Sequence, residues 1–132
     1  MTEIKLPNNL LCLMSHDPGT TLWINHCLNF DIVTSGTSEE DAWQGMKRVL
    51  KSHVESCVAD NFVAGLSKKA DADAWRAFID QALVSVPRSE PIEFDFKEKD
   101  GLSGICLKGV EVESLPSPIH AGARRPDCPV YA

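Results

Sequence analysis

The sequence predicts an α+β fold, because short strand-type runs and longer amphipathic helical runs follow one another along a single chain. Three apolar, β-type segments come first, and a long helix with one apolar stripe follows them. A second helix and two further strand-type segments complete the pattern. The 132 residues are 43% hydrophobic and 24% charged, which fits one globular domain and excludes global disorder.

The first three strands are predicted at residues 10–15, 20–28 and 30–34. The turn-forming residues Asp17, Pro18 and Gly19 separate the first two strands, and Ser35-Gly36 ends the third. Short strands joined by tight turns predict an antiparallel meander.

The long helix is predicted over residues 37–58, because apolar residues recur there every three or four positions. A capping box starts it, formed by Thr37 with Glu40 or by Ser38 with Asp41. Gly45 lies inside this helix and costs about 1 kcal/mol relative to Ala, which predicts a close packing partner there.

A second helix is predicted at residues 71–83, capped by Asp71 or Asp73. Strict alternation predicts a half-buried strand at 92–97, a hairpin turn at Asp100-Gly101 and a return strand at 105–112, with a bulge at Gly109. We therefore expect one domain over residues 1–113. The proline-rich segment 114–132 is expected to be an extended or disordered tail.

The net charge and the number of cysteines exclude some classes of protein function. The net charge of −6 argues against a protein held mainly by nucleic-acid phosphates. No apolar stretch is long enough to predict a membrane span, and the first residues do not resemble a signal peptide. The five cysteines are scattered and odd in number, which favours reduced thiols in a cytoplasmic protein.

Two groups of His and Cys residues have spacings that occur in metal sites. The first comprises Cys12, His16, His26 and Cys27, although neighbouring strand residues 26 and 27 point to opposite faces. The second is the pair His53 and Cys57 on one helical face. Buried core thiols and partly buried imidazoles explain both groups as well, and we expect no metal and no cofactor.

The acidic and basic residues offer two further hypotheses. A remnant two-metal nuclease would use carboxylates from the set Asp17, Asp31, Glu39, Glu40 and Asp41, but helix capping and turn formation explain these residues. We therefore expect no catalytic residues. The basic residues Lys47, Arg48 and Lys51, with Lys68 and Lys69 beyond them, form a solvated helix face or a minor RNA contact.

The segment from Trp23 to Ser56 resembles the HicB family of antitoxins and their stand-alone relatives. The matching residues are Cys27, Leu28, Asp31, Val33, Gly36, Thr37, Glu39, Glu40, Ala42 and the helix to about His53. The resemblance implies a partial ribonuclease-H-like β-β-β-α-β fold without that fold's catalytic carboxylates. It also implies binding of a small basic RNA-cleaving toxin of the HicA type.

Family members often carry a DNA-binding segment after this core. Here the second helix has Arg76 against Asp71, Asp73 and Asp80, so the sequence does not predict operator binding. We expect a non-enzymatic HicB-like binding module, which would be an antitoxin if its partner is such a toxin. The alternative is a small hydrolase or nuclease on a degenerate ribonuclease-H-like scaffold.

Four carboxylates on the predicted hairpin are the candidate partner-binding residues: Glu93, Asp95, Glu111 and Glu113. They would attract a basic partner, or they would simply form the solvated side of a half-buried hairpin. The open edges of a small sheet also favour pairing between copies, so we expect a homo-oligomer.

Overall fold

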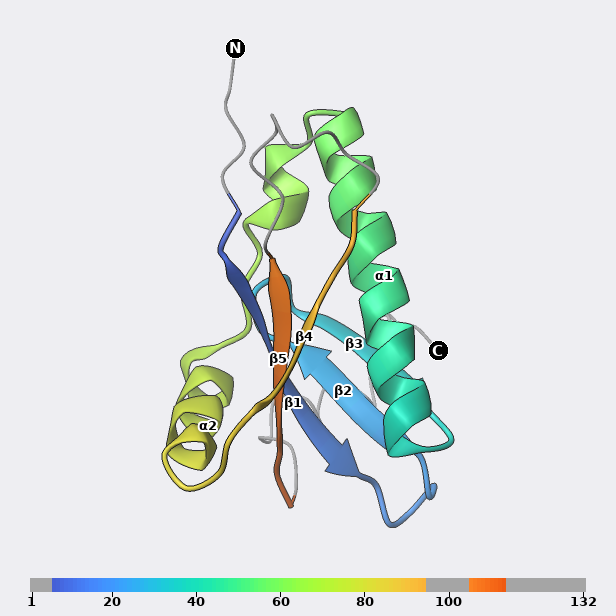
Figure 1. Cartoon of the computed structure of the whole chain (residues 1–132), viewed down its shortest axis with the longest axis vertical. Coiled ribbons are helices and arrows are strands. Elements are labelled where there is room, and N and C mark those ends of the chain that lie inside the picture. The colour runs from blue at the N-terminus through green and yellow to red at the C-terminus, as the bar shows by residue number, and fades with distance from the viewer. Residues whose placement is uncertain (1–5, 95–104, 114–132) are drawn as a thin grey trace.

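The computed structural model describes residues 6–94 and 105–113 and has the predicted α+β architecture (Figure 1). A five-stranded mixed sheet has the strand order β3-β2-β1-β5-β4. Its strands are β1 (Asn9–His16), β2 (Trp23–Cys27), β3 (Ile32–Gly36), β4 (Arg88–Pro91) and β5 (Cys106–Glu111). The helices are α1 (Glu39–Ala59), the short 3-10 helix η1 (Val63–Leu66) and α2 (Ala72–Ala82). None of the helices described is long and apolar enough to cross a membrane.

The first three strands form the predicted antiparallel meander. The carboxylate of Asp17 closes the first turn, accepting hydrogen bonds from the Gly19 N–H (3.1 Å) and the Thr20 hydroxyl (2.8 Å). In the second turn Asp31 has a left-handed φ of 55°, a conformation that Asp tolerates better than most residues. Its Oδ1 lies 2.7 Å from Nε2 of the buried His26, which fixes the turn to β2.

Helix α1 begins at the second of the two predicted caps. The Ser38 hydroxyl accepts a hydrogen bond from the Asp41 N–H (3.0 Å), and the Asp41 carboxylate accepts one from the Thr37 N–H (3.0 Å). These bonds satisfy backbone donors that a helix start otherwise leaves open. Helix α2 is capped in the same way by Asp71, whose carboxylate accepts from the Ala74 N–H (3.1 Å).

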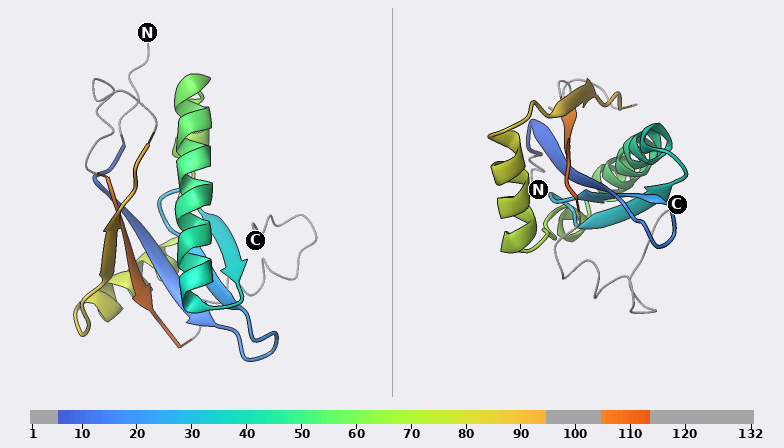
Figure 2. Two further views of the ribbon diagram at one scale, coloured as in Figure 1. Left: turned by 45° about the vertical axis from the view of Figure 1, so that its right-hand side comes forward. Right: turned by 90° about the horizontal axis from the view of Figure 1, so that it is seen from below.

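The sheet lies between α1 and α2, which cover opposite faces (Figure 2). Alternation along β1 sends Leu10, Cys12 and Met14 toward α1 and Leu13 toward α2. The core under α1 is the larger one and includes Trp43, Met46, Leu50, Val54, Phe30 and Leu107. The core under α2 contains Leu13, Leu28, Ala70, Ala74, Phe78 and Val110.

The C-terminal half differs from the sequence-based prediction in strand position. Strand β4 occupies 88–91, and residues 92–94 lie beyond it, although the Ile92 N–H still donates to the Ile105 carbonyl (3.0 Å). The rest of the predicted strand 92–97, the turn Asp100-Gly101 and the tail 114–132 lie outside the described residues. Strand β5 pairs antiparallel with β4 as expected, but its other neighbour is β1, with which it runs parallel.

The predicted bulge at Gly109 is wrong, since Gly109 pairs in unbroken register with Arg88 on one side and Cys12 on the other. A Cβ on Gly109 would lie 2.5 Å from the Trp43 ring, so glycine is needed here for the close approach of α1. The packing partner predicted for Gly45 is also absent, because the nearest atom to an added Cβ there belongs to the flexible Arg48 side chain, 3.7 Å away.

These two glycines give a matched pair of substitutions. Gly109→Ala should lower the free energy of unfolding by about 1–3 kcal/mol, because Trp43 would have to move. Gly45→Ala should raise it by about 0.5–1 kcal/mol, because Ala restricts the unfolded chain in a helical position with open space. Urea unfolding of both variants measures the two effects, and a stable Gly109→Ala protein would contradict the close approach.

Candidate protein-binding site

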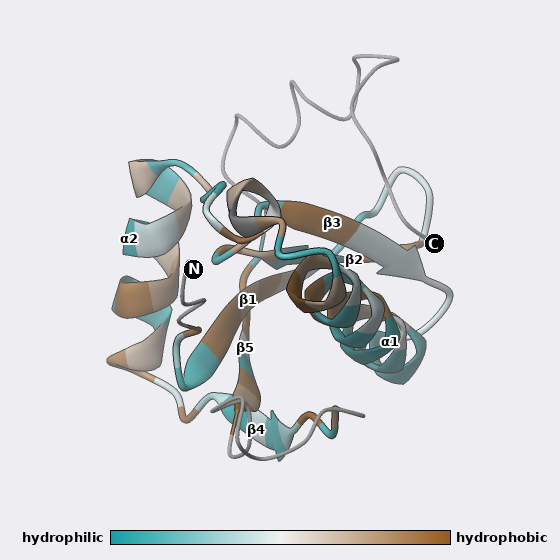
Figure 3. Cartoon of the chain, turned by 90° about the horizontal axis from the view of Figure 1, so that it is seen from above, coloured by the Kyte–Doolittle hydropathy of each residue, from teal (hydrophilic) through white to brown (hydrophobic). Residues whose placement is uncertain are grey.

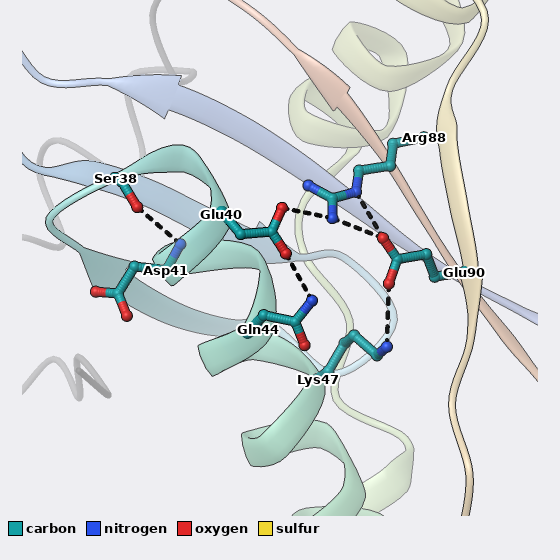
Figure 4. Close-up of polar contacts among 7 residues, drawn as sticks. All are labelled: Ser38, Glu40, Asp41, Gln44, Lys47, Arg88 and Glu90. Atoms are coloured by element: carbon teal, nitrogen blue, oxygen red, sulfur yellow. Dashed lines mark hydrogen bonds and ion pairs between the residues drawn. The ribbon is translucent and has the colours of Figure 1, made fainter.

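A chain of charged residues connects α1 to the edge strand β4 (Figure 4). Arg88 donates to Oε1 of Glu40 (2.8 Å) and, through Nε and Nη2, to Oε2 of Glu90 (2.9 and 2.6 Å). The other oxygen of Glu90 accepts from Nζ of Lys47 (3.1 Å), and Glu40 also accepts from Gln44 (2.7 Å). Alternation places Arg88 and Glu90 on the face of β4 that meets α1, so five side chains form one network.

Contact with Trp43 and mutual hydrogen bonds hold these charged side chains in place. The Arg88 guanidinium lies over the Trp43 ring, 4.4 Å from its centroid, in a cation–π contact. Partial burial by itself would raise the pKa of Glu90, but hydrogen bonds from Arg88 and Lys47 lower it from 4.5 to about 2. The same site holds Glu40 ionised, since hydrogen bonds from Gln44 and Arg88 lower its pKa.

A groove of about 480 Å³ runs beside this network, between α1 and the chain that continues from β4. One wall is formed by Gln44, Lys47, Arg48 and Lys51, and the other by residues 90–93. The three basic residues singled out in the sequence therefore share one surface. Lys47 is paired with Glu90, and Lys51 with Glu55 (2.8 Å), so much of their charge is neutralised within the molecule.

Oppositely charged side chains pair beside the groove, whereas two carboxylates lie close together at the C-terminal end of β5. Glu39, in the first turn of α1, lies beside Glu111, the last residue of that strand. Partial burial and the Glu111 carboxylate both raise the pKa of Glu39, and the nearby Arg88 guanidinium offsets only part of this. Glu113 follows two residues later, exposed, with its carbonyl accepting from the Ser15 hydroxyl (3.1 Å). We call Glu39, Glu111 and Glu113 the acidic end.

Of the four predicted partner-binding carboxylates, the three that the structure describes do not lie together. Glu111 and Glu113 belong to the acidic end, whereas Glu93 lies on the rim of the groove. Pro91 pairs with Cys106, the first residue of β5, so Glu93, two residues after Pro91, lies near that end of the strand. Glu111 is five residues further along β5, a distance of about 17 Å. Asp95 lies outside the described residues.

The predicted Cys/His group separates into three places. Cys12 and Cys27 are directly opposite each other on β1 and β2, fully buried under α1. His16 lies on the same face but four residues, about 13 Å, further along β1, where it stacks on Trp23. His26 lies on the opposite face of the sheet and binds Asp31.

The other metal and nuclease candidates are also engaged locally. His53 binds the Gly65 carbonyl through Nε2 (2.6 Å), which ties α1 to η1, and the Cys57 thiol lies 3.9 Å away. Of the predicted nuclease carboxylates, Asp17 and Asp31 hold turns, Asp41 caps α1 and Glu40 pairs with Arg88, whereas Glu39 lies beside Glu111. Within residues 6–94 and 105–113, no three His, Cys, Asp or Glu side chains group closely enough to hold a metal ion.

Three residues of the candidate site were not assigned to it from the sequence: Glu39, Arg88 and Glu90. Glu39 was interpreted as a capping residue, and its nearness to Glu111 depends on the packing of α1 across β5. Arg88 and Glu90 carried a usable signal, because they alternate with Ser89 directly after Pro87, as edge-strand residues do.

Comparison of the chain with family models, curated proteins and solved structures finds no match in any of the three.

The pKa of Glu90 predicts a pH-dependent contribution to stability. Its folded-state pKa of about 2 is below the ordinary 4.5, so the contribution is full above pH 4.5 and disappears as the pH falls through 2. Glu90→Gln should lower the free energy of unfolding at pH 7 by about 1 kcal/mol, after allowance for solvent screening. This difference should vanish near pH 2.

The control for Glu90→Gln is Glu93→Gln, which removes the same charge from the exposed groove rim. Urea unfolding across the acid range measures both variants beside the wild type. A Glu93→Gln effect as large as that of Glu90→Gln would show that net charge, rather than the network, is responsible.

The Cys12–Cys27 pair predicts a site-selective oxidation. The Leu28 N–H donates to the Leu11 carbonyl (2.8 Å), so alternation makes 12/27 a non-hydrogen-bonded pair. Cα atoms in such pairs are about 4.5 Å apart, within the range that a disulfide bridges. Burial by itself raises the pKa of Cys27, but hydrogen bonds from Cys12 and from the N–H groups of Asn29 and Phe30 lower it.

Diamide should therefore convert these two thiols into a disulfide, taking up two hydrogen atoms as it is reduced. Intact-mass analysis should show that loss, and peptide mapping should join the peptides of Cys12 and Cys27. The reaction should speed up in mild urea because both thiols are buried. Cys12→Ser should abolish this bridge, and a bridge between Cys57 and Cys106 instead would contradict the prediction.

Proposed function

We propose that this chain is a non-enzymatic binding module of HicB type, which acts in the cytoplasm and docks a small basic protein at its acidic end. The observation that carries the proposal is the contact between Glu39 and Glu111. Two like charges held together cost stability, and the nearby Arg88 relieves this only in part, because the pKa of Glu39 is still raised. A further cationic side chain placed beside them would relieve the remaining cost. A basic partner therefore has a defined place to bind.

The order of elements supports the HicB-type proposal. Strands β1, β2 and β3 come before α1, and the later strand β5 joins β1 in parallel. This is the β-β-β-α-β series that the resemblance implies, with α2 and β4 added between α1 and β5.

The arrangement of charges also favours binding over catalysis. A two-metal nuclease needs several carboxylates converging on one point. Here Glu40 is held by Arg88 and Gln44, Asp41 by the helix cap, and Asp31 by His26. We therefore propose that the chain acts by docking rather than by hydrolysis, with a HicA-like toxin as its partner.

The experiment is a kinetic one. The tagged chain is purified from its source cells at low salt, and we expect a short Lys- and Arg-rich protein to accompany it and dissociate as salt rises. With that protein purified, the triple variant Glu39→Gln, Glu111→Gln, Glu113→Gln should reduce the association rate at low salt by about tenfold. The defect should shrink at high salt.

Glu93→Gln combined with Glu55→Gln and Asp73→Gln is the matched control, because it removes three negative charges away from the acidic end. An equal rate reduction in the control would mean that net charge alone attracts the partner. An unchanged rate in the acidic-end variant, or an acidic partner, would contradict the proposed function.

A further inference from the structure

Four of the five large exposed apolar side chains of the described residues lie close together in the chain, and the fifth, Phe62, lies elsewhere. Ile79 is 56% exposed, Leu83 79%, Val84 78% and Val86 95%. They occupy the end of α2 and the connection to β4, where Figure 3 shows hydrophobic colouring on the end of the helix. We call these four residues the apolar corner.

The residues of the apolar corner are not needed to pack α2 against the sheet. The inner side of that helix is already buried through Ala74 and Phe78. Ile79 and Leu83 are four positions apart and therefore share another face of the helix, and Val84 and Val86 extend it into the loop. Water-exposed aliphatic surface of this extent is typical of an interaction site.

The adjoining strand edge cannot supply the interaction by strand addition. The Ile92 N–H donates to the Ile105 carbonyl, so residue 92 belongs to a hydrogen-bonded pair with β5. Such pairs alternate along an antiparallel strand, so the N–H and C=O groups of residues 88 and 90 also point toward β5, and those of residues 87, 89 and 91 point away from the sheet. Positions 87 and 91 are prolines, which have no N–H. Ser89 is thus the single outward donor of these three, and an edge of this kind resists pairing.

We propose that the apolar corner is a two-fold contact between two copies of this chain, made by side chains and not by strand pairing. A second copy necessarily brings the same apolar surface, which a two-fold axis places against the first. Residues 81–87 carry no charge, so two chains with a net charge of −6 each meet here on a neutral segment.

The available area fits a weak, closed dimer. Four aliphatic side chains at these exposures present on the order of 500 Å² of surface. Two copies would bury about 1,000 Å² in total, which is the lower limit for a specific interface. The dimer should accordingly dissociate in the micromolar range.

Sedimentation equilibrium of the full chain between about 5 and 500 µM tests the proposal. The wild type should change from monomer to dimer within that range. Leu83→Glu combined with Val86→Glu should weaken dimerisation at least tenfold, because each charge would be buried against its symmetry mate. Both positions are mostly exposed in the monomer, so thermal melting followed by circular dichroism should show an unchanged fold.

Phe62→Glu is the matched control, because Phe62 is as exposed as Ile79 but follows α1 at another place in the chain. This variant should dimerise like the wild type. A wild type that stays monomeric throughout, as it would if another part of the chain covered the corner, overturns the proposal. So does a dimer that survives Leu83→Glu with Val86→Glu, since its interface would lie elsewhere, such as the β3 edge.

Discussion

The packing of Trp43 against Gly109 is the contact on which the rest of this structure depends. The indole is fully buried, and the missing side chain at Gly109 lets it approach the backbone of β5. Arg88 then covers the ring from β4, and its guanidinium reaches Glu40 and Glu90. One aromatic side chain of α1 thereby contacts both β5 and β4 and lies under the charged residues that connect the helix to the edge strand.

Local patterns in the sequence were sufficient for the first three strands, both α-helices and the position of β5, but not for the position of β4 or for the neighbours of β5. Turn chemistry at Asp17 and the cap at Ser38 act within a few residues, so they are readable without knowing the tertiary structure. The parallel pairing of β1 with β5 joins distant segments, and no local signal announces it. Gly109 shows the same limit, because a glycine within a strand signals a bulge or a close approach equally well, and only the position of Trp43 decides between them.

For the candidate site, the sequence identified some of the residues but did not predict which of them lie together in the fold. Glu111 and Glu113 were identified from their alternation, but they were grouped with Glu93 because the hairpin was expected a few residues later than β4 begins. Their real neighbour, Glu39, comes from the first turn of α1. Attractive pairs are thus used inside the molecule, between α1 and β4, while a repulsive pair remains at its surface. The proposed docking of a basic partner depends on that repulsive pair.

The central position of β5 has a consequence for how the chain reaches this structure. Its partner β1 precedes it by about a hundred residues, so the middle of the sheet closes only after the intervening elements have been made. Until then the β1 edge, with Leu10, Cys12 and Met14 on the strand, has no neighbour on one side. We expect closure of so long a loop to be a slow step in folding, and the meander with α1 to form before it. We therefore expect the chain to be most prone to misassembly before β5 has paired with β1.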